Sequence, residues 1–269
     1  MFVVGRGKRA THLLAVDTNR HRNVLFKALS LPVLGSVIRF LMDAKGTVFT
    51  HIPVYEGIAV DGGAALPITV AEHFIREASH HVLLDYCPCR KALGCSEYDA
   101  NIGCIFVGEG ARAINPEVGR HVGVEETLDH LHKAVDAGLV PMVGKVKFDA
   151  DYLGVKDRHH LMTICICCPC CCLASGVQYA PKNVRDLVVR LEGVEVRVDG
   201  DCDGCGICVE TCIYKQIEVV DGHAVVGEEC KGCGRCAVVC PKDVISISVD
   251  NPEYIRQCID RISAFVDVK

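Results

Sequence analysis

The amino-acid sequence predicts an α+β protein in two unequal parts: an α/β N-terminal domain rich in cysteine, followed by a small domain built on a doubled βαβ unit. Three observations predict this fold class. Apolar residues recur at helical spacing in several segments, short apolar runs of strand length end in cysteine clusters, and one cysteine spacing occurs twice between residues 198 and 250. Mixed periods of this kind are typical of helices packed on sheets.

Cysteine is the unusual feature of the composition. The chain has 269 residues, of which 50% are apolar, 23% are charged and 19 are cysteine. This composition excludes a disordered or collagen-like chain, and a chain of this length buries a core without disulfides. An odd number of thiols also cannot pair completely. We therefore interpret the cysteines as thiolate ligands in a reducing compartment.

Residues 1–45 differ in charge from the rest of the chain. They hold eight basic and two acidic residues, although the net charge of the whole chain is −5. Apolar residues at helical spacing follow within this segment: Val33, Leu34, Val37, Ile38 and Leu41. The pattern predicts a basic amphipathic helix that packs on its own domain, or else lies on an anionic membrane surface or an acidic partner. Nucleic acid is not an expected partner, since the remaining chain is acidic.

The localisation predicted from the sequence is cytoplasmic, with peripheral membrane contact as the alternative. No apolar run approaches the length of about 18 residues that a membrane-spanning helix needs. The first apolar block starts only near Val24, and no A-x-A-like cleavage site of a secretory signal precedes it.

Three segments have clear helical periodicity. Thr69 and Glu72 form a capping-box pattern before an apolar stripe, and a second stripe runs from Val124 to Val135 with Gly138 as its C-terminal signal. A last stripe runs from Ile255 to Phe265, and a further short helix is expected from Asn183 to Leu191. These segments supply the helices of the predicted fold.

Two apolar runs, 82–84 and 161–164, are expected to be strands. Each follows a histidine pair and precedes a Cys-x-Cys sequence, which predicts neighbouring strands that bring two cysteine clusters to one site. Paired histidines are more often surface or capping residues than ligands. The resulting domain plan has five parts: a basic segment 1–45, a cysteine-rich domain 46–180, a connecting helix and strand 181–197, a repeat domain 198–250 and a C-terminal helix 251–269.

The cysteines of residues 198–250 form two copies of one motif, C-x2-C-x2-C-x3-C, and a proline follows the second copy. Three thiolates at this spacing bind three irons of one cubane, and the fourth cysteine reaches the other cluster. We therefore assign two [4Fe–4S] clusters. The ligands of the first are Cys202, Cys205, Cys208 and Cys240, and those of the second are Cys230, Cys233, Cys236 and Cys212.

With these motifs, residues 198–250 resemble a bacterial-type dicluster ferredoxin. Glycines beside the ligands fit the resemblance because they let backbone N–H groups approach the cluster sulfurs. Short strands are expected at 216–220, 224–226 and 244–249. Ile213 stands after Cys212 where the family usually has proline, which weakens the expected turn geometry there without removing a ligand. Two structural zinc sites are the alternative, since C-x2-C is also a zinc motif.

Ten further cysteines come before the repeat domain, and six of them fall within eight residues. Neighbouring side chains cannot all enter one small ligand sphere, so Cys170, Cys171 and Cys172 must divide between faces or metals. Arg90 and Lys91 would offset the charge of bound thiolates. We expect at least one further iron–sulfur cluster here, with a four-cysteine zinc site as the alternative. The candidate metal ligands are Cys87, Cys89, Cys95, Cys104, Cys165, Cys167, Cys168, Cys170, Cys171 and Cys172.

The N-terminal cysteines resemble known proteins only loosely. Cys87-Pro-Cys-Arg with the later cysteine run is similar to uncharacterised iron–sulfur proteins of anaerobes. The Cys167-Cys168 pair is similar to the cysteine-rich domain of heterodisulfide reductases, but Pro169 stands where that motif has glycine. No dinucleotide fingerprint or P-loop is present.

Three functions agree with these patterns. The first is an electron-transfer protein that relays low-potential electrons through two [4Fe–4S] clusters between the N-terminal cluster and a partner redox enzyme. The second is a reductase, in which the N-terminal cluster is the catalytic site for a disulfide or another small substrate. The third is a redox or iron–sulfur sensor.

Overall fold

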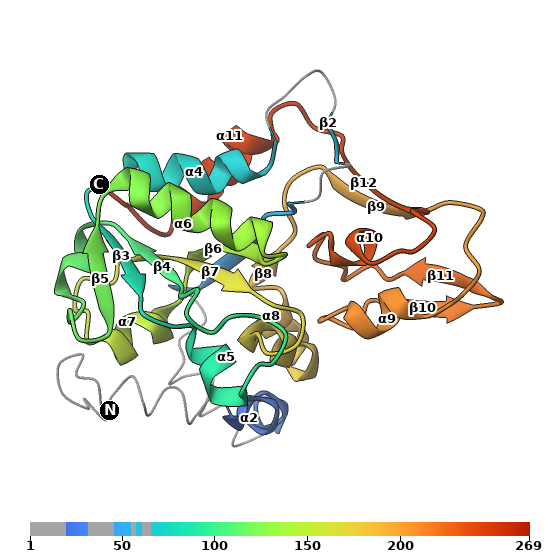
Figure 1. Ribbon diagram of the computed structural model, residues 1–269, viewed down its shortest axis with the longest axis horizontal. Helices are drawn as coiled ribbons and strands as arrows, with labels where there is room; N and C mark the ends of the chain where they lie inside the picture. Colours follow the sequence, from blue (N-terminus) through green and yellow to red (C-terminus); the bar gives the residue numbers. More distant parts are fainter. Residues whose placement is uncertain (1–19, 32–45, 55–57, 61–65) are drawn as a thin grey trace.

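A seven-stranded sheet forms the centre of the larger part of the molecule (Figure 1). The computed structural model describes residues 20–31, 46–54, 58–60 and 66–269. Within the sheet the strand order is β5-β3-β4-β7-β6-β1-β8. The strands are β1 (Val48–His51), β3 (His81–Leu84), β4 (Ile105–Val107), β5 (Gly119–Val122), β6 (Val140–Lys145), β7 (Met162–Cys167) and β8 (Val188–Val189).

The pairing in this sheet confirms the α+β class but corrects the α/β expectation for the N-terminal domain. Only β1 with β8 is parallel, and the other five hydrogen-bonded strand pairs are antiparallel. The expected neighbours β3 and β7 are separated by β4. The consecutive strands β3 and β4, and likewise β6 and β7, pair directly and antiparallel.

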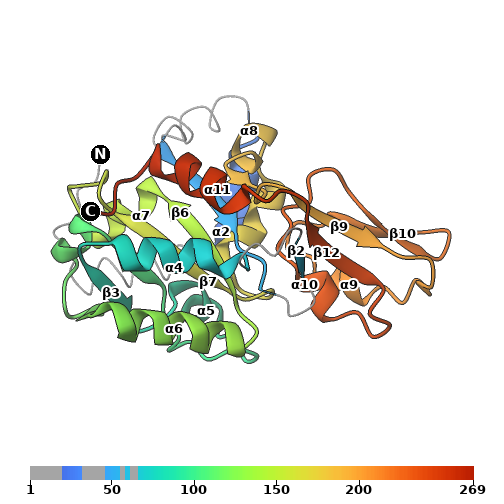
Figure 2. The ribbon, with the colours of Figure 1, turned by 90° about the horizontal axis from the view of Figure 1, so that it is seen from above.

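Three helices lie side by side on one face of the sheet (Figures 1 and 2): α4 (Ile68–Glu77), α6 (Val124–Asp136) and α11 (Tyr254–Ser263). Phe74, Leu131 and Ile262 of these helices are buried in the same core. The helices predicted from Val124 and from Ile255 are therefore confirmed. The capping box is wrong, because α4 begins at Ile68 after Pro67, which places Thr69 inside the first turn.

The opposite face of the sheet is covered by shorter elements. These are α2 (Arg22–Ala28), α5 (Pro88–Leu93), η3 (Glu109–Ala113), α7 (Lys147–Leu153), η4 (Leu173–Tyr179) and α8 (Lys182–Arg185). The helix expected over residues 183–191 ends at Arg185, because the β-branched pair Val188-Val189 joins the sheet as β8. Of the basic segment 1–45, the apolar stripe from Val33 to Leu41 lies outside the described residues.

The smaller part of the molecule, on the right in Figure 1, contains the repeated cysteine motif. Its strands and helices are β9 (Val194–Val198), α9 (Ile207–Thr211), β10 (Ile217–Val220), β11 (His223–Val226), α10 (Arg235–Val238) and β12 (Ile245–Val249). β9 pairs with β12, while β10 and β11 form a hairpin. Its turn, Asp221-Gly222, has positive φ at both residues, as a type I′ turn requires. The strands expected in this region are present.

Two segments connect the parts of the molecule. β2 (Ala59–Val60) pairs in parallel with β12, and α11 follows β12 and packs against α4. The main core also continues from the helical face of the large sheet to Ile217, Ala224 and Ile245 of the smaller part. Across the described ranges, no helix combines the length and the apolar character that crossing a bilayer needs.

Candidate metal centres

The first set of C-terminal cysteines surrounds one hollow, which is lined by Cys202, Cys205, Cys208 and Cys240. Cys240 comes from the second copy of the motif, and α9 and α10 contact each other, so the two copies are interlocked. The backbone N–H of Ala224 donates to Cys202 Sγ at 3.3 Å. Cys205 is exposed, which puts this end of the hollow at the surface.

The second set also brings together cysteines of both copies. Burial and the charges of Cys233, Cys230 and Cys212 raise the pKa of Cys236 to about 12. Backbone N–H groups donate to two of these sulfurs, from Gly232 to Cys230 Sγ at 3.4 Å and from Gln216 to Cys212 Sγ at 3.3 Å. Cys212 therefore lies with the cysteines of the other copy.

Both sets fit an iron–sulfur cluster by the chemistry of their donors. Buried thiolates repel one another, and a cationic iron core removes that cost. N–H donors directed at the sulfurs are the outer contacts that such clusters use. Beside the first set, the backbone at Gly204 (φ 69°) approaches that of Gly222 so closely that a Cβ at Gly204 would lie 2.6 Å from the carbonyl oxygen of Gly222.

Six of the ten N-terminal cysteines pack in the clusters on the sheet face opposite α4, α6 and α11. Along β7, Ile164 and Ile166 point into the helical core, whereas Cys165 and Cys167 pack with the clusters of the other face. This division follows from the two-residue period of a strand. A cavity of about 210 Å³, which we call the thiol cavity, lies on this face between the sheet and α2, α5, α7 and η4.

Seven cysteines from three segments line the thiol cavity, namely Cys168 and six others: Cys87, Cys89, Cys104, Cys165, Cys167 and Cys172. The Sγ atoms of Cys167 and Cys172 are 3.0 Å apart. A hydrogen bond to Cys87, together with burial and the charges of Cys87, Cys172 and Cys165, raises the pKa of Cys89 well above its usual value. For comparison, an engineered 150 Å³ cavity accommodates benzene. The thiol cavity is therefore large enough for a compact group bound by several sulfurs.

A close backbone approach positions Cys104 in this cavity. The Leu84 N–H donates to the Cys104 carbonyl at 3.0 Å, and a Cβ at Gly103 would lie 1.9 Å from the Leu84 carbonyl oxygen. Glycine is thus required immediately before this ligand. Cys87 and Cys89 are held at the N-terminal end of α5, where Cys87 is the N-cap residue.

The remaining four N-terminal cysteines form a separate group, which we call the tetrathiolate group: Cys95, Cys168, Cys170 and Cys171. Their Sγ atoms all lie within 4.8 Å of one another. Cys168 also borders the thiol cavity. The run Cys170-Cys171-Cys172 is therefore divided, as expected, because Cys172 faces the cavity and its two neighbours face the tetrathiolate group.

Arg90 connects both groups of N-terminal cysteines. Its buried guanidinium donates to the carbonyl of Asp99 at 3.1 Å, to that of Ile166 at 2.9 Å and to that of Ile102. The charges of Cys87, Cys104 and Cys168 outweigh the effect of burial and raise its pKa further. Lys91, which was expected to act beside it, instead lies 5.8 Å from the ring centre of Tyr86.

Asp149 is a buried acid in the wall of the thiol cavity that sequence reasoning missed. Burial raises its pKa to about 7, against a lowering by the hydrogen bond from Thr163 Oγ1 at 2.7 Å. No motif surrounds Asp149 in the sequence. Only the packing of α7 on β7 reveals that this carboxyl exchanges its proton near neutral pH.

Replacing this acid should change how stability depends on pH. Between the unfolded pKa of 3.8 and the folded value of about 7, folded Asp149 keeps a proton that the unfolded chain has lost, so the free energy of unfolding falls as pH rises through this window. The variant Asp149→Asn has no such group to titrate, so it does not lose stability in this way as the pH rises. We expect its stability advantage to grow by about 2 kcal/mol between pH 5.5 and 8 and then to stay constant. Denaturant unfolding of anaerobically purified protein measures it, with Asp151→Asn on the exposed side of α7 as control. An advantage independent of pH would contradict the assignment.

Three buried residues join the C-terminal cysteines to the thiol cavity. Arg235, which lies between Cys233 and Cys236 in sequence, donates from Nη2 to the carbonyl of Cys167 at 2.5 Å. Tyr214 lies two residues after Cys212, and its hydroxyl is 2.6 Å from His51 Nε2. Burial and then the charge of Arg235 lower the pKa of His51 to about 3, so His51 is neutral at physiological pH. In the sequence, the one signal that could have indicated the contact between Arg235 and β7 is an arginine placed between two ligand cysteines.

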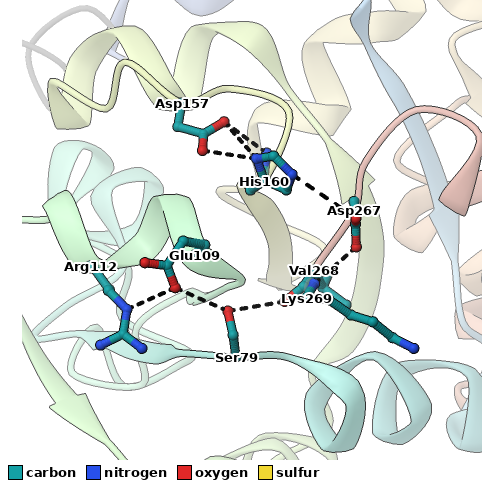
Figure 3. A network of polar contacts seen from close by, with 8 residues as sticks. All are labelled: Ser79, Glu109, Arg112, Asp157, His160, Asp267, Val268 and Lys269. Atoms are coloured by element: carbon teal, nitrogen blue, oxygen red, sulfur yellow. Dashed lines mark hydrogen bonds and ion pairs between the residues drawn. The ribbon is translucent and has the colours of Figure 1, made fainter.

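The histidine pairs have structural partners. Figure 3 shows His160 between Asp157 and Asp267, and Ser79 joined to Glu109 and to the carbonyl of Val268. His81 is buried with Nε2 2.6 Å from the carbonyl oxygen of Ile75. These contacts fasten the C-terminal tail and α4, in agreement with the structural role that the sequence favoured for these histidines.

Comparison with known protein families gives one match. The family model of the 4Fe–4S binding domain matches residues 224–246, which contain Cys230, Cys233, Cys236 and Cys240. Comparisons with curated proteins and with solved structures return no match. The chain therefore contains a ferredoxin-like segment and is an iron–sulfur protein with at least one 4Fe–4S cluster.

Proposed function

We propose that this iron–sulfur protein relays low-potential electrons between a partner redox enzyme and a cysteine-bound cluster in its N-terminal domain. Two [4Fe–4S] clusters in a doubled βαβ domain would carry the relay. A [4Fe–4S] cluster accepts and releases one electron at a time. The first set of cysteines would hold the cluster nearer the surface, and the second set would hold the cluster nearer the thiol cavity.

The observation that carries this proposal is the contact made by Arg235. This residue belongs to the loop and helix of the second set, and its guanidinium reaches the backbone of β7 at Cys167, a lining residue of the thiol cavity. Tyr214, two residues after Cys212, makes a second connection, because it packs in one buried cluster with Cys167 and Cys172. Two independent buried contacts thus support direct communication between the second set and the N-terminal cysteines.

The side chains of the relay have separate tasks in this proposal. Backbone donors at Cys202, Cys212 and Cys230 stabilise the thiolate form of the ligands. The thiols of the second set are half-buried or buried, while the exposed Cys205 end leaves the first set open to a partner protein. The six thiols of the thiol cavity other than Cys168 would bind the further iron–sulfur cluster.

Metal analysis of anaerobically purified full-length protein tests the proposal. Two cubanes give about eight irons and eight sulfides per chain, and a further cluster raises both numbers together. Redox titration followed by EPR spectroscopy should show two cubane signals that reduce at low potential. Protein without acid-labile sulfide after anaerobic reconstitution would exclude the relay.

A reductase is the second candidate function, and the shape of the thiol cavity favours it. Reduction of a disulfide to two thiols consumes two electrons, which the clusters would supply one at a time, and two protons. Asp149 lies in the wall of this cavity with a pKa of about 7, so it can supply one of these protons and the other would come from solvent. A paramagnetic state that appears only when oxidised protein meets a thiol substrate would support the reductase. EPR signals that do not change when thiol substrates are added would favour the electron relay without a reductase activity.

A further inference from the structure

We propose that the tetrathiolate group binds one tetrahedral divalent metal ion, Zn²⁺ or Fe²⁺, as a mononuclear site separate from every iron–sulfur cluster. The four ligands are Cys95, Cys168, Cys170 and Cys171. This site divides the ten N-terminal cysteines into four that bind a single ion and six that face the thiol cavity.

The spacing of the sulfurs is the first argument. Four thiolates bound at about 2.3 Å to one tetrahedral ion lie about 3.8 Å apart. The four Sγ atoms here are all within 4.8 Å of one another, and those of Cys95 and Cys170 are 3.4 Å apart. The ligands of a cubane bind four different irons and must therefore spread more widely. The group has the dimensions of a single-ion site.

The hydrogen bonds around these sulfurs are the second argument. The N–H of Cys171 donates to Cys168 Sγ at 3.2 Å. The Arg90 guanidinium donates to the carbonyl of Ile166, two residues before Cys168, at 2.9 Å. Donors of this kind stabilise thiolates and orient them for a metal. Cys168 is thus already held as a metal site requires.

The local backbone explains how close neighbours in sequence reach one ion. Residues 169–171 form a turn directly after β7, which directs Cys168, Cys170 and Cys171 to one side. Cys95 follows Gly94, whose left-handed conformation (φ 61°) ends α5 and turns the chain toward this group. The ion would tie the end of α5 to the end of β7 and thereby hold the wall of the thiol cavity.

The variant Cys170→Ala tests the site, because this ligand is exposed and its loss leaves no buried void. Full-length protein is purified without oxygen, and zinc, iron and acid-labile sulfide are measured per chain. We expect the variant to lose about one zinc or one iron while its sulfide content is unchanged. Cys258→Ala, which removes a buried thiol of α11 outside all these groups, should keep every metal.

Two further measurements identify the ion, and they keep the site testable if the variant folds poorly. X-ray absorption at the zinc or iron edge of wild-type protein should show four sulfurs at about 2.3 Å around the ion. Co²⁺ added to metal-depleted protein should give the intense visible bands of tetrahedral thiolate cobalt, and Cys170→Ala should lose them. Loss of iron and sulfide in equal amounts would instead assign these cysteines to a cluster. Retention of all metals in the variant would overturn the site outright. Either result leaves the relay to be judged by its own sulfide and EPR measurements.

Discussion

Cys205→Ala is expected to remove one of the two [4Fe–4S] clusters that we propose for residues 198–250, which is about four irons and four sulfides per chain. Cys205 lines the hollow of the first set and lies apart from Cys212, Cys230, Cys233 and Cys236. Cysteine-to-alanine exchange leaves no substitute ligand at this exposed position. Metal analysis and the spin count of the reduced protein should show that the other cluster remains.

The variant Cys212→Ala tests whether Cys212 binds the cluster of the other copy of the motif. Cys212 belongs to the same copy of the motif as Cys205, but its charge acts on Cys233 and Cys236 of the other copy. We therefore expect the EPR spectrum of Cys212→Ala to match that of Cys230→Ala and to differ from that of Cys205→Ala. A match between Cys212→Ala and Cys205→Ala would show that each copy holds its own cluster. Cys258→Ala is the control, since its buried thiol is far from both sets in sequence and should leave iron unchanged.

Arg235→Met is expected to alter the second cluster alone and to weaken the junction between the two parts. The guanidinium of Arg235 is buried, and its charge favours the thiolate forms of Cys233, Cys167 and Cys172. Loss of a nearby positive charge makes an added electron less favourable. We expect the reduction potential of one C-terminal cluster to fall by on the order of 60 mV, or about 1.4 kcal/mol for one electron. Loss of the buried hydrogen bond from Arg235 to the Cys167 carbonyl should lower the free energy of unfolding by about 1–3 kcal/mol.

Two further variants separate charge from packing at this position. Arg235→Lys keeps the positive charge but not the planar donor group, so it should restore most of the potential and little of the stability. Arg197→Met removes an exposed arginine of β9 that pairs with Glu195, and both measured quantities should stay at wild-type values. Equal shifts of both cluster potentials in Arg235→Met would contradict the assignment of Arg235 to the second set.

Local patterns in the sequence predicted the elements that depend on short-range periodicity. The stripes in α6 and α11 predicted these helices because residues three and four apart must share one face. The strands β10 and β12 were expected as parts of a doubled βαβ unit, and β9 as the strand of the connecting segment. The start of α4 was not predicted correctly, because Pro67 is the N-cap residue and Thr69 lies within the first turn. The segment 188–189 became a strand only because β1 offers it hydrogen bonds.

By itself, the sequence determined that the C-terminal region is ferredoxin-like and that its cysteines come in two sets of four. Ligand spacing within a tight loop limits what the loop can bind, so the motif carries its chemistry without knowledge of distant residues. The division of the ten N-terminal cysteines was decided only by the tertiary structure. Strand alternation, the turn after β7 and the buried Arg90 sort them into the thiol cavity and the tetrathiolate group. The roles of Asp149 and Arg235 were also decided only by the tertiary structure, because they depend on burial and on long-range contacts. The residues next to them in sequence do not predict these roles.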